Sequence, residues 1–227
     1  MSGQNCWHFE SIPRAVFEKV LAIFSVNDAK PRTTPLTNHI KLSKEQSPKI
    51  AQEREDMTLV SYASVVGSLM YAMVCTRPGI AYVVKVVSRY MAHPSKEHWE
   101  AIKWLLRYLR STSSTSLCFG NGKAILQSFV DDDLGGDVDS SKSTSGYIYT
   151  IGGTAVIWIS RLQKCVSLSS TESEYMAIAE AGKEMIWLAD YLEELVEDGD
   201  MCLEKIEVAK NPADMLTKCV DVGKLRL

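Results

Sequence analysis

The sequence has no closely spaced pair of cysteines. Its six cysteines are spread over the whole chain: Cys6, Cys75, Cys118, Cys165, Cys202 and Cys219. Because no two of them form a C-x-x-C unit, nothing in their spacing indicates a zinc site or a thiol–disulfide redox motif. We therefore expect reduced thiols, as in an intracellular protein.

The sequence also lacks an excess of basic charge and a long apolar run. The 227 residues carry a formal net charge of −3 at pH 7, so only a local basic patch could bind nucleic acid. Residues 1–20 do not resemble a signal peptide, and the most apolar later run, residues 65–74, is shorter than a membrane span. We expect an intracellular protein, cytoplasmic or nuclear, with no membrane partner.

The chemistry of the chain changes twice along its length, which predicts three regions. Residues 1–56 contain an amphipathic helix at 14–24. The proline-rich stretch at 27–57 is expected to be an extended connector that lies over another part of the protein, or to be partly disordered. Residues 57–112 predict a small helical unit with one helix from Ser61, one opened by Pro78 and one capped by Ser95. Residues 113–227 combine β-type runs with one long helix, which predicts an α/β region.

The α/β region contains two glycine-rich turn signals. The first hairpin is expected around residues 120–122, and the second around Gly152 and Gly153. A third β run is expected at 164–170, followed by a long amphipathic helix at 171–196. Near the end, LEKIEV predicts a short strand and NPADM predicts a helix that begins at Pro212.

Three consecutive aspartates, Asp131 to Asp133, follow the apolar run AILQSFV and allow three interpretations. A polymerase places such aspartates in a hairpin between two apolar strands, but LGGDVDSSKSTSG, which follows here, does not read as a strand. A two-metal site needs carboxylates from separate elements, and Asp131, Glu174 and Asp214 are candidates. The third interpretation is a polar loop, with Glu174 and Asp214 complementing helix dipoles. Spacing alone leaves the last two interpretations open.

Several long segments resemble one known family. They are DDDLGGDVDSSKSTSGY at 131–147, KSTSGYIYTIGGTAVIWISRLQKCVSLSSTESEYMAIAEAGKEMIWL at 142–188 and NPADMLTK at 211–218. These segments are similar to the ribonuclease H domain of copia-type retrotransposon Pol polyproteins. Upstream, residues 62–112 resemble the segment that joins reverse transcriptase to ribonuclease H in the same polyproteins.

This resemblance implies a ribonuclease H-like α/β fold with a mixed sheet, which hydrolyses the RNA strand of an RNA–DNA hybrid. The first family aspartate falls on Asp131, the helix glutamate on Glu174 and the last aspartate on Asp214. These three are then the expected catalytic residues and ligands of Mg²⁺, or of Mn²⁺, with Asp131 bridging two metal ions. The expected partners are the hybrid and the upstream reverse transcriptase of the same polyprotein. The polymerase aspartates would lie before residue 1, so this chain is not expected to polymerise.

The sequence departs from the family after the long helix. The family continues with a strand that carries a Cys-Asp-Asn-Gln box, whose aspartate completes the metal set, and then with another helix. Here residues 195–196 run directly into EDGDMCLEKIEV, and Asp198 and Asp200 in this gap do not match the box. We therefore expect an incomplete domain with an open sheet edge, an exposed apolar face and little or no nuclease activity.

A group of polar residues in two neighbouring turns is predicted to contact nucleic-acid phosphates, because hydroxyl and amine groups position a nucleic-acid backbone. The residues are Lys142, Ser143, Thr144, Ser145, Arg161 and Lys164. The alternative interpretation is a solvated loop and hairpin. Two rival functions also stay open: a nucleic-acid-binding remnant without catalysis, and a host interaction module that binds no nucleic acid.

Overall fold

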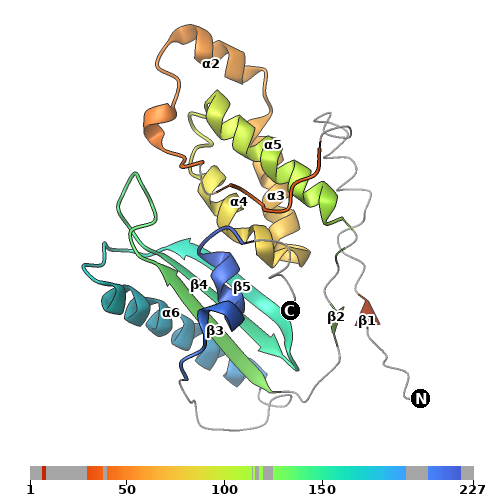
Figure 1. Ribbon diagram of the computed structural model, residues 1–227, viewed down its shortest axis with the longest axis vertical. Helices are drawn as coiled ribbons and strands as arrows, with labels where there is room; N and C mark the ends of the chain where they lie inside the picture. The colour runs from red at the N-terminus through yellow and green to blue at the C-terminus, as the bar shows by residue number, and fades with distance from the viewer. Residues whose placement is uncertain are drawn as a thin grey trace.

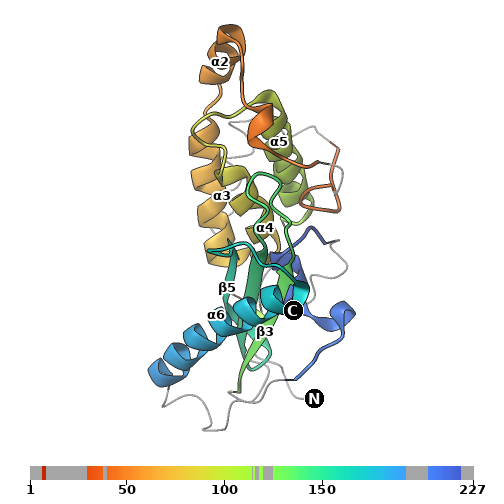
Figure 2. The same ribbon diagram turned by 90° about the vertical axis from the view of Figure 1, so that its left-hand side faces the viewer.

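The computed structural model describes residues 7–8, 30–37, 40–113, 115, 118–119, 125–192 and 204–220. Within these ranges, a helical unit stands at one end of a three-stranded antiparallel sheet, and one long helix covers a face of that sheet (Figures 1 and 2). The predicted α/β architecture with a preceding helical unit is therefore confirmed.

The expected mixed sheet is not found, since every strand pair in the described ranges is antiparallel. A parallel pair needs a crossover connection, usually a helix, that carries the chain back to a further strand. The long helix could serve as that crossover.

The helical unit consists of α3 (Tyr62–Thr76), α4 (Ala81–Ser88) and α5 (Lys96–Ser111). These helices confirm the three predicted ones, although Pro78 opens a 3-10 turn, η2 (Pro78–Ile80), before α4 begins. Their apolar faces supply most of the larger of two cores. Among the described helices, none alone has the length and apolar character of a membrane span; α2 and α3 meet that test only jointly, across a 53° bend.

The predicted connector is extended only in part. Residues 30–37 lie along α5, where the Trp104 indole N–H donates to the Thr34 carbonyl at 2.9 Å. Further on, η1 (Lys44–Gln46) is a 3-10 turn and α2 (Ala51–Thr58) is a helix, so the prediction of extended backbone is wrong there. The reason is that AQEREDMT is rich in strong helix formers. The helix predicted at 14–24 lies outside the described residues.

The sheet is formed by β3 (Leu126–Asp133), β4 (Thr144–Ile151) and β5 (Thr154–Leu162), in that order. The hairpin predicted between β4 and β5 is confirmed. Gly152 and Gly153 have φ angles of +59° and +78°, the left-handed conformation that a tight two-residue turn requires.

Three other strand predictions are wrong. The run LEKIEV contains no strand in its described residues, since residues 204–207 are irregular and η3 (Val208–Lys210) is a 3-10 turn. β2 (Cys118–Phe119) pairs with β1 (Trp7–His8) and not with β3, because its partner is a distant segment that a local pattern cannot reveal. Residues 164–169, predicted as a β run, contain no strand. Their serines act as turn and cap residues, since the Ser169 side chain accepts from the Glu172 backbone N–H at 3.2 Å and so caps α6 (Ser170–Tyr191).

The sheet has a core on each face, because alternate residues of a strand point to opposite sides. Tyr147 and Tyr149 of β4 pack with α6, whereas Ile148 packs with the helical unit. The Tyr149 hydroxyl also donates to the Ala181 carbonyl of α6 at 2.6 Å. The outer side of α6 leaves four large apolar side chains exposed: Tyr175, Ile186, Trp187 and Tyr191.

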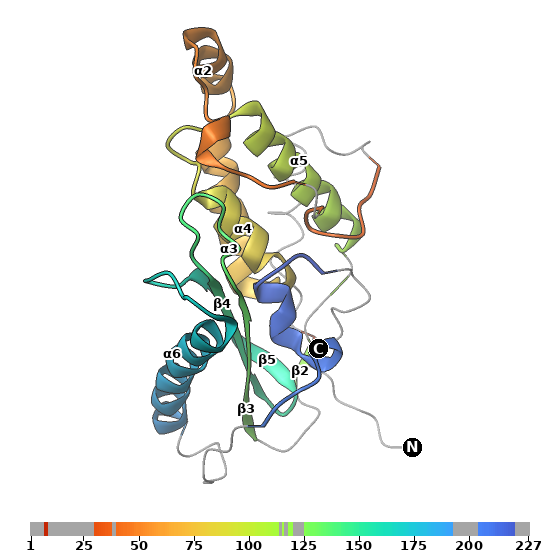
Figure 3. The ribbon, with the colours of Figure 1, turned by 60° about the vertical axis from the view of Figure 1, so that its left-hand side comes forward.

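The C-terminal turn η4 (Pro212–Leu216) packs on the face of the sheet opposite to α6 and also contacts the helical unit (Figure 3). Gly146 of β4 permits this approach. A Cβ atom on Gly146 would lie 2.6 Å from the Cβ of Leu216 and 2.9 Å from the Cγ2 of Thr217, closer than real contacts allow. The turn can therefore sit against the strand only because this residue has no side chain.

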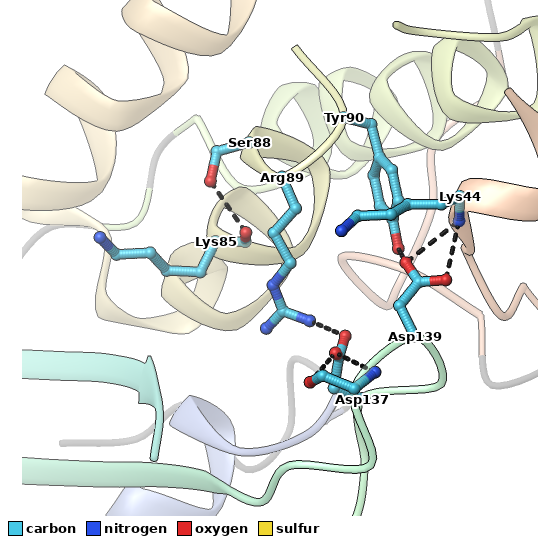
Figure 4. A network of polar contacts seen from close by, with 8 residues as sticks. Lys44, Lys85, Ser88, Arg89, Tyr90, Asp137 and Asp139 are labelled. Atoms are coloured by element: carbon cyan, nitrogen blue, oxygen red, sulfur yellow. Dashed lines mark hydrogen bonds and ion pairs between the residues drawn. The ribbon is translucent and has the colours of Figure 1, made fainter. Parts of the chain in front are cut away.

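Two aspartates fasten the loop between β3 and β4 to the helical unit (Figure 4). Arg89, next to the end of α4, forms an ion pair with the buried carboxylate of Asp137. Both carboxylate oxygens of Asp139 accept from the Lys44 backbone N–H, at 2.9 and 3.0 Å, and the Tyr90 hydroxyl donates to Asp139 at 3.3 Å. These contacts fix the loop that follows the three aspartates of β3.

Replacing Gly146 with alanine should lower the free energy of unfolding by about 1–3 kcal/mol, because the added methyl group would force the turn away from the sheet. Gly182→Ala is the matched control. It lies within α6, where an added Cβ has no neighbour within 4 Å, so it should raise the same quantity by about 0.5–1 kcal/mol. Urea unfolding measures both variants, and a stabilising effect of Gly146→Ala would contradict the close approach.

Replacing Arg89 with methionine should lower the free energy of unfolding by about 1–3 kcal/mol, because Asp137 would lose its charged partner while it stays buried. Lys103→Met serves as the control, since Lys103 pairs with the exposed Glu100 on the surface of α5 and should contribute less than about 1 kcal/mol. Chemical denaturation of both variants tests this difference. Equal losses would show that the Arg89 ion pair acts as an ordinary surface pair.

Candidate acidic site

The three aspartates are the last residues of β3, and the strand divides them between the two faces of the sheet. Val130 packs into the core beneath α6, so Asp132, two residues further on, points to the same face. There the Asp132 carboxylate interacts with Ser173 and with the charge of Glu174. Asp131 and its neighbour Asp133 point to the opposite face, where η4 lies.

Asp131 meets the C-terminal turn directly. The Thr217 hydroxyl donates a hydrogen bond to the Asp131 carboxylate, and Asp214 lies near enough to act on it electrostatically. Asp214 is only 2% exposed, and Lys218 forms an ion pair with it. The structure therefore brings Asp131 and Asp214 together, around an ammonium group.

The start of η4 is held on β3 by one side chain. The Asn211 amide N–H donates to the Val130 carbonyl at 2.8 Å, and its oxygen accepts from the Ala213 backbone N–H at 3.1 Å. Asn211 thus caps the turn and joins it to the strand next to Asp131. The segment NPADMLTK folds into this position because its cap, its proline and its apolar pair Met215 and Leu216 all favour a short buried turn.

Glu174 does not join the other two predicted ligands. It is an exposed residue of α6, the helix that lies on the face of the sheet opposite to η4 (Figure 3). Over the described ranges, no group of three or more His, Cys, Asp or Glu side chains is arranged to hold a metal ion. The residues present therefore do not fit the two-metal set that the family resemblance implies. Asp198 and Asp200 lie outside the described residues.

Burial raises the pKa of the carboxyl groups of Asp131, Asp132 and Asp133 above the ordinary value, because a charged carboxylate loses hydration there. The positive charge of Lys218 opposes this shift in all three. Burial by itself would lower the pKa of Lys218, but its hydrogen bond to Asp214 and the charge of Asp131 raise it above its usual value. The pKa values of these aspartates and of Lys218 therefore depend on one another.

The three hydroxyl residues predicted to contact phosphates are buried. Ser143 and Ser145 are 0% exposed and Thr144 is 2% exposed. The Ser143 hydroxyl accepts from the Gly135 backbone N–H at 3.1 Å, and the Ser145 hydroxyl accepts from the Gln163 side-chain amide at 3.0 Å. These hydroxyl groups serve the fold, because a phosphate cannot reach them without opening the sheet.

The three basic residues of that predicted group remain on the surface. Lys142 and Lys164 come together in adjacent turns, where the Lys142 ammonium donates to the Lys164 carbonyl at 2.8 Å. Arg161 is paired with Glu180 of α6 at 3.4 Å. The prediction of phosphate contact therefore rests on these three side chains alone.

Thr217 and Lys218 are the site residues that the sequence did not single out. A signal for Lys218 was present, because a lysine four residues after an aspartate lies on the same face of a helical turn. No comparable signal marked Thr217, since its contact with Asp131 joins two segments that are far apart in the chain.

Comparisons with known proteins identify the class. No family model and no solved structure matches the chain. Curated relatives do match, and they show that the chain is similar to a part of the retrovirus-related Pol polyproteins of plant transposons.

The individual relatives come from several organisms. The chain is 45% identical over 252 residues to the "Retrovirus-related Pol polyprotein from transposon TNT 1-94" of Nicotiana tabacum, covering 92% of this chain and 19% of that protein. It is 38% identical over 177 residues to the corresponding protein from transposon RE1 of Arabidopsis thaliana, covering 78% of this chain and 12% of that protein. It is also 48% identical over 133 residues to "Secreted RxLR effector protein 161" of Plasmopara viticola, covering 58% of this chain and 94% of that protein.

Replacing Asp133 with asparagine should stabilise the protein at neutral pH. The raised pKa means that the folded protein binds a proton at this carboxyl more tightly than the unfolded chain, whose value is near 3.8. The stability from this group is therefore lost as the pH rises from the unfolded pKa through the folded one. The variant has no such loss, so its advantage in free energy of unfolding should appear at pH 7 and vanish below pH 3.8. Urea unfolding across this range tests the prediction, and a less stable variant at pH 7 would contradict it.

Proposed function

We propose that this chain is an incomplete ribonuclease H-like region of a copia-type Pol polyprotein that no longer cleaves nucleic acid. The ancestral activity is hydrolysis of the RNA strand of an RNA–DNA hybrid, beside the reverse transcriptase of the same polyprotein. The observation that carries this proposal is the meeting of Asp131 and Asp214, which come from β3 and from the C-terminal turn. They are the two positions at which the resemblance expects the first and last aspartates of such an enzyme.

Loss of cleavage follows from the composition of this site. In a two-metal nuclease, Mg²⁺ ions supply an activated water and stabilise the leaving oxygen, and several carboxylates must offset their charges. Here Asp131 and Asp214 already share the ammonium of Lys218, and Glu174 belongs to α6 on the other face of the sheet. Among the described residues, no group of three or more such side chains is arranged to hold these ions.

The comparison with the tobacco polyprotein supports an internal deletion. The alignment runs over 252 residues, whereas the whole chain has 227, so the relative contains residues that have no counterpart here. The sequence departs from the family pattern after α6, where a strand and a helix are missing. The exposed apolar side of α6 and the all-antiparallel sheet are consistent with the loss of those elements.

A second candidate is an interaction module that acts without nucleic acid. The relative named as a secreted effector is covered over 94% of its length, so a sequence of this kind also occurs as a short separate protein. The weak basic character of the predicted phosphate contacts favours this candidate as well, because Arg161 is already paired with Glu180.

Incubation of the folded protein with a labelled RNA–DNA hybrid, first in Mg²⁺ and then in Mn²⁺, should give no cleavage. The matched control is Asp131→Asn, which keeps an acceptor for the Thr217 hydroxyl and should behave identically. Metal-dependent cleavage that disappears in this variant would overturn the proposal.

Fluorescence anisotropy with the same hybrid over a series of salt concentrations separates the two candidates. Binding that weakens with salt indicates a nucleic-acid-binding remnant, because phosphate contacts release counter-ions. Absence of binding at low salt favours the interaction module.

A further inference from the structure

We propose that Lys218 is a built-in counter-ion, whose ammonium takes the place of a divalent cation beside Asp131 and Asp214. The C-terminal turn is then fastened to the sheet by charge without any metal ion. This inference rests on the proposed function, because it takes these two aspartates as the remains of a metal-binding set. It goes further in assigning them a present role, which is structural.

The position of Lys218 follows from the turn that carries it. The backbone N–H of Lys218 donates to the Asp214 carbonyl at 3.3 Å, so the two side chains lie on the same side of the turn. The Lys218 ammonium forms an ion pair with the Asp214 carboxylate, whose side chain is 3% exposed. A carboxylate buried to this degree needs a cation or several donors, and the lysine comes from the same turn.

The turn contacts every strand of the sheet, so the ion pair closes a larger clasp. Thr217 donates to Asp131 of β3, and the Ser160 hydroxyl of β5 donates to the Leu216 carbonyl. Gly146 of β4 gives the turn the space to make these contacts. The clasp therefore joins the end of the described chain to all three strands through contacts that involve no metal ion.

A divalent cation would have to displace these internal partners. Ca²⁺ and Mg²⁺ require six or more oxygen ligands, from the protein or from water. Asp131 already accepts from Thr217, and Asp214 is already paired with Lys218. Asp133 points to the same face as Asp131, but the charge of Lys218 acts on it too, and Asp132 points to the other face of the sheet. Removal of Lys218 is therefore needed before a cation can approach these acids.

Thermal unfolding without nucleic acid tests the counter-ion. The wild-type midpoint should be the same in excess MgCl₂ and in EDTA. Lys218→Met should lower the midpoint by about 5–10 °C in EDTA, since it leaves a buried carboxylate unpaired. MnCl₂ or MgCl₂ should restore part of this loss in the variant, because the cation can then take the vacated position.

Two further variants serve as controls. Lys210→Met removes a lysine of the same segment that pairs with Glu207, where both side chains are about 70% exposed, and should shift the midpoint by about 0–2 °C. Lys218→Arg keeps the positive charge and should stay near the wild-type midpoint, with no response to metal.

Isothermal titration calorimetry of the wild-type protein with MnCl₂ decides the proposal even if Lys218→Met does not fold. No heat of binding is expected. Specific binding that Asp214→Asn abolishes would overturn the inference, and so would a Lys218→Met variant as stable as Lys210→Met. These measurements use no RNA–DNA hybrid, so they test the role of Lys218 alone. Cleavage of the hybrid, measured separately, would instead overturn the proposed function.

Discussion

The seating of the C-terminal turn against Gly146 is the contact on which the other features of the fold depend. A strand residue without a side chain lets η4 lie directly on β4, so that Met215 and Leu216 enter the core shared with the helical unit. One face of the sheet is thereby closed by the turn and the helices, and the other by α6. The same contact brings Asp214 beside Asp131, although the two residues belong to distant parts of the chain.

Pairing of acidic side chains is a second recurring feature at this end of the sheet. Asp137 is paired with Arg89, Asp139 accepts from the Lys44 backbone, and Asp214 is paired with Lys218. The contacts of Asp137 and Asp139 join the β3–β4 loop to the helical unit, whereas the pair of Asp214 and Lys218 lies within the C-terminal turn. An unpaired buried carboxylate is costly, so these pairs stabilise the positions of the loop and the turn.

The outer side of α6 is an exposed apolar surface. Trp187 and Tyr191 stack on each other there in solvent, with 5.7 Å between their ring centroids. The plant Pol proteins are much longer than this chain, which aligns with about a fifth or less of each of the two. An internal deletion after α6, as proposed above, would account for both the exposed surface and the absence of a parallel strand from the described sheet.

Local signals in the sequence were enough to predict the helices that follow Pro78 and Ser95 and the turn at Gly152 and Gly153. Caps, prolines and positive φ angles act over only a few residues, so a short stretch reveals them. The resemblance to a family came from longer matching segments. The local signals misjudged the pairing of β2 and the helix α2, since propensity and context competed there. Only the tertiary structure decided that Glu174 lies across the sheet from Asp131 and that Lys218 joins the acids. Those outcomes depend on strand alternation and on the close approach of distant segments, which no short stretch of sequence encodes.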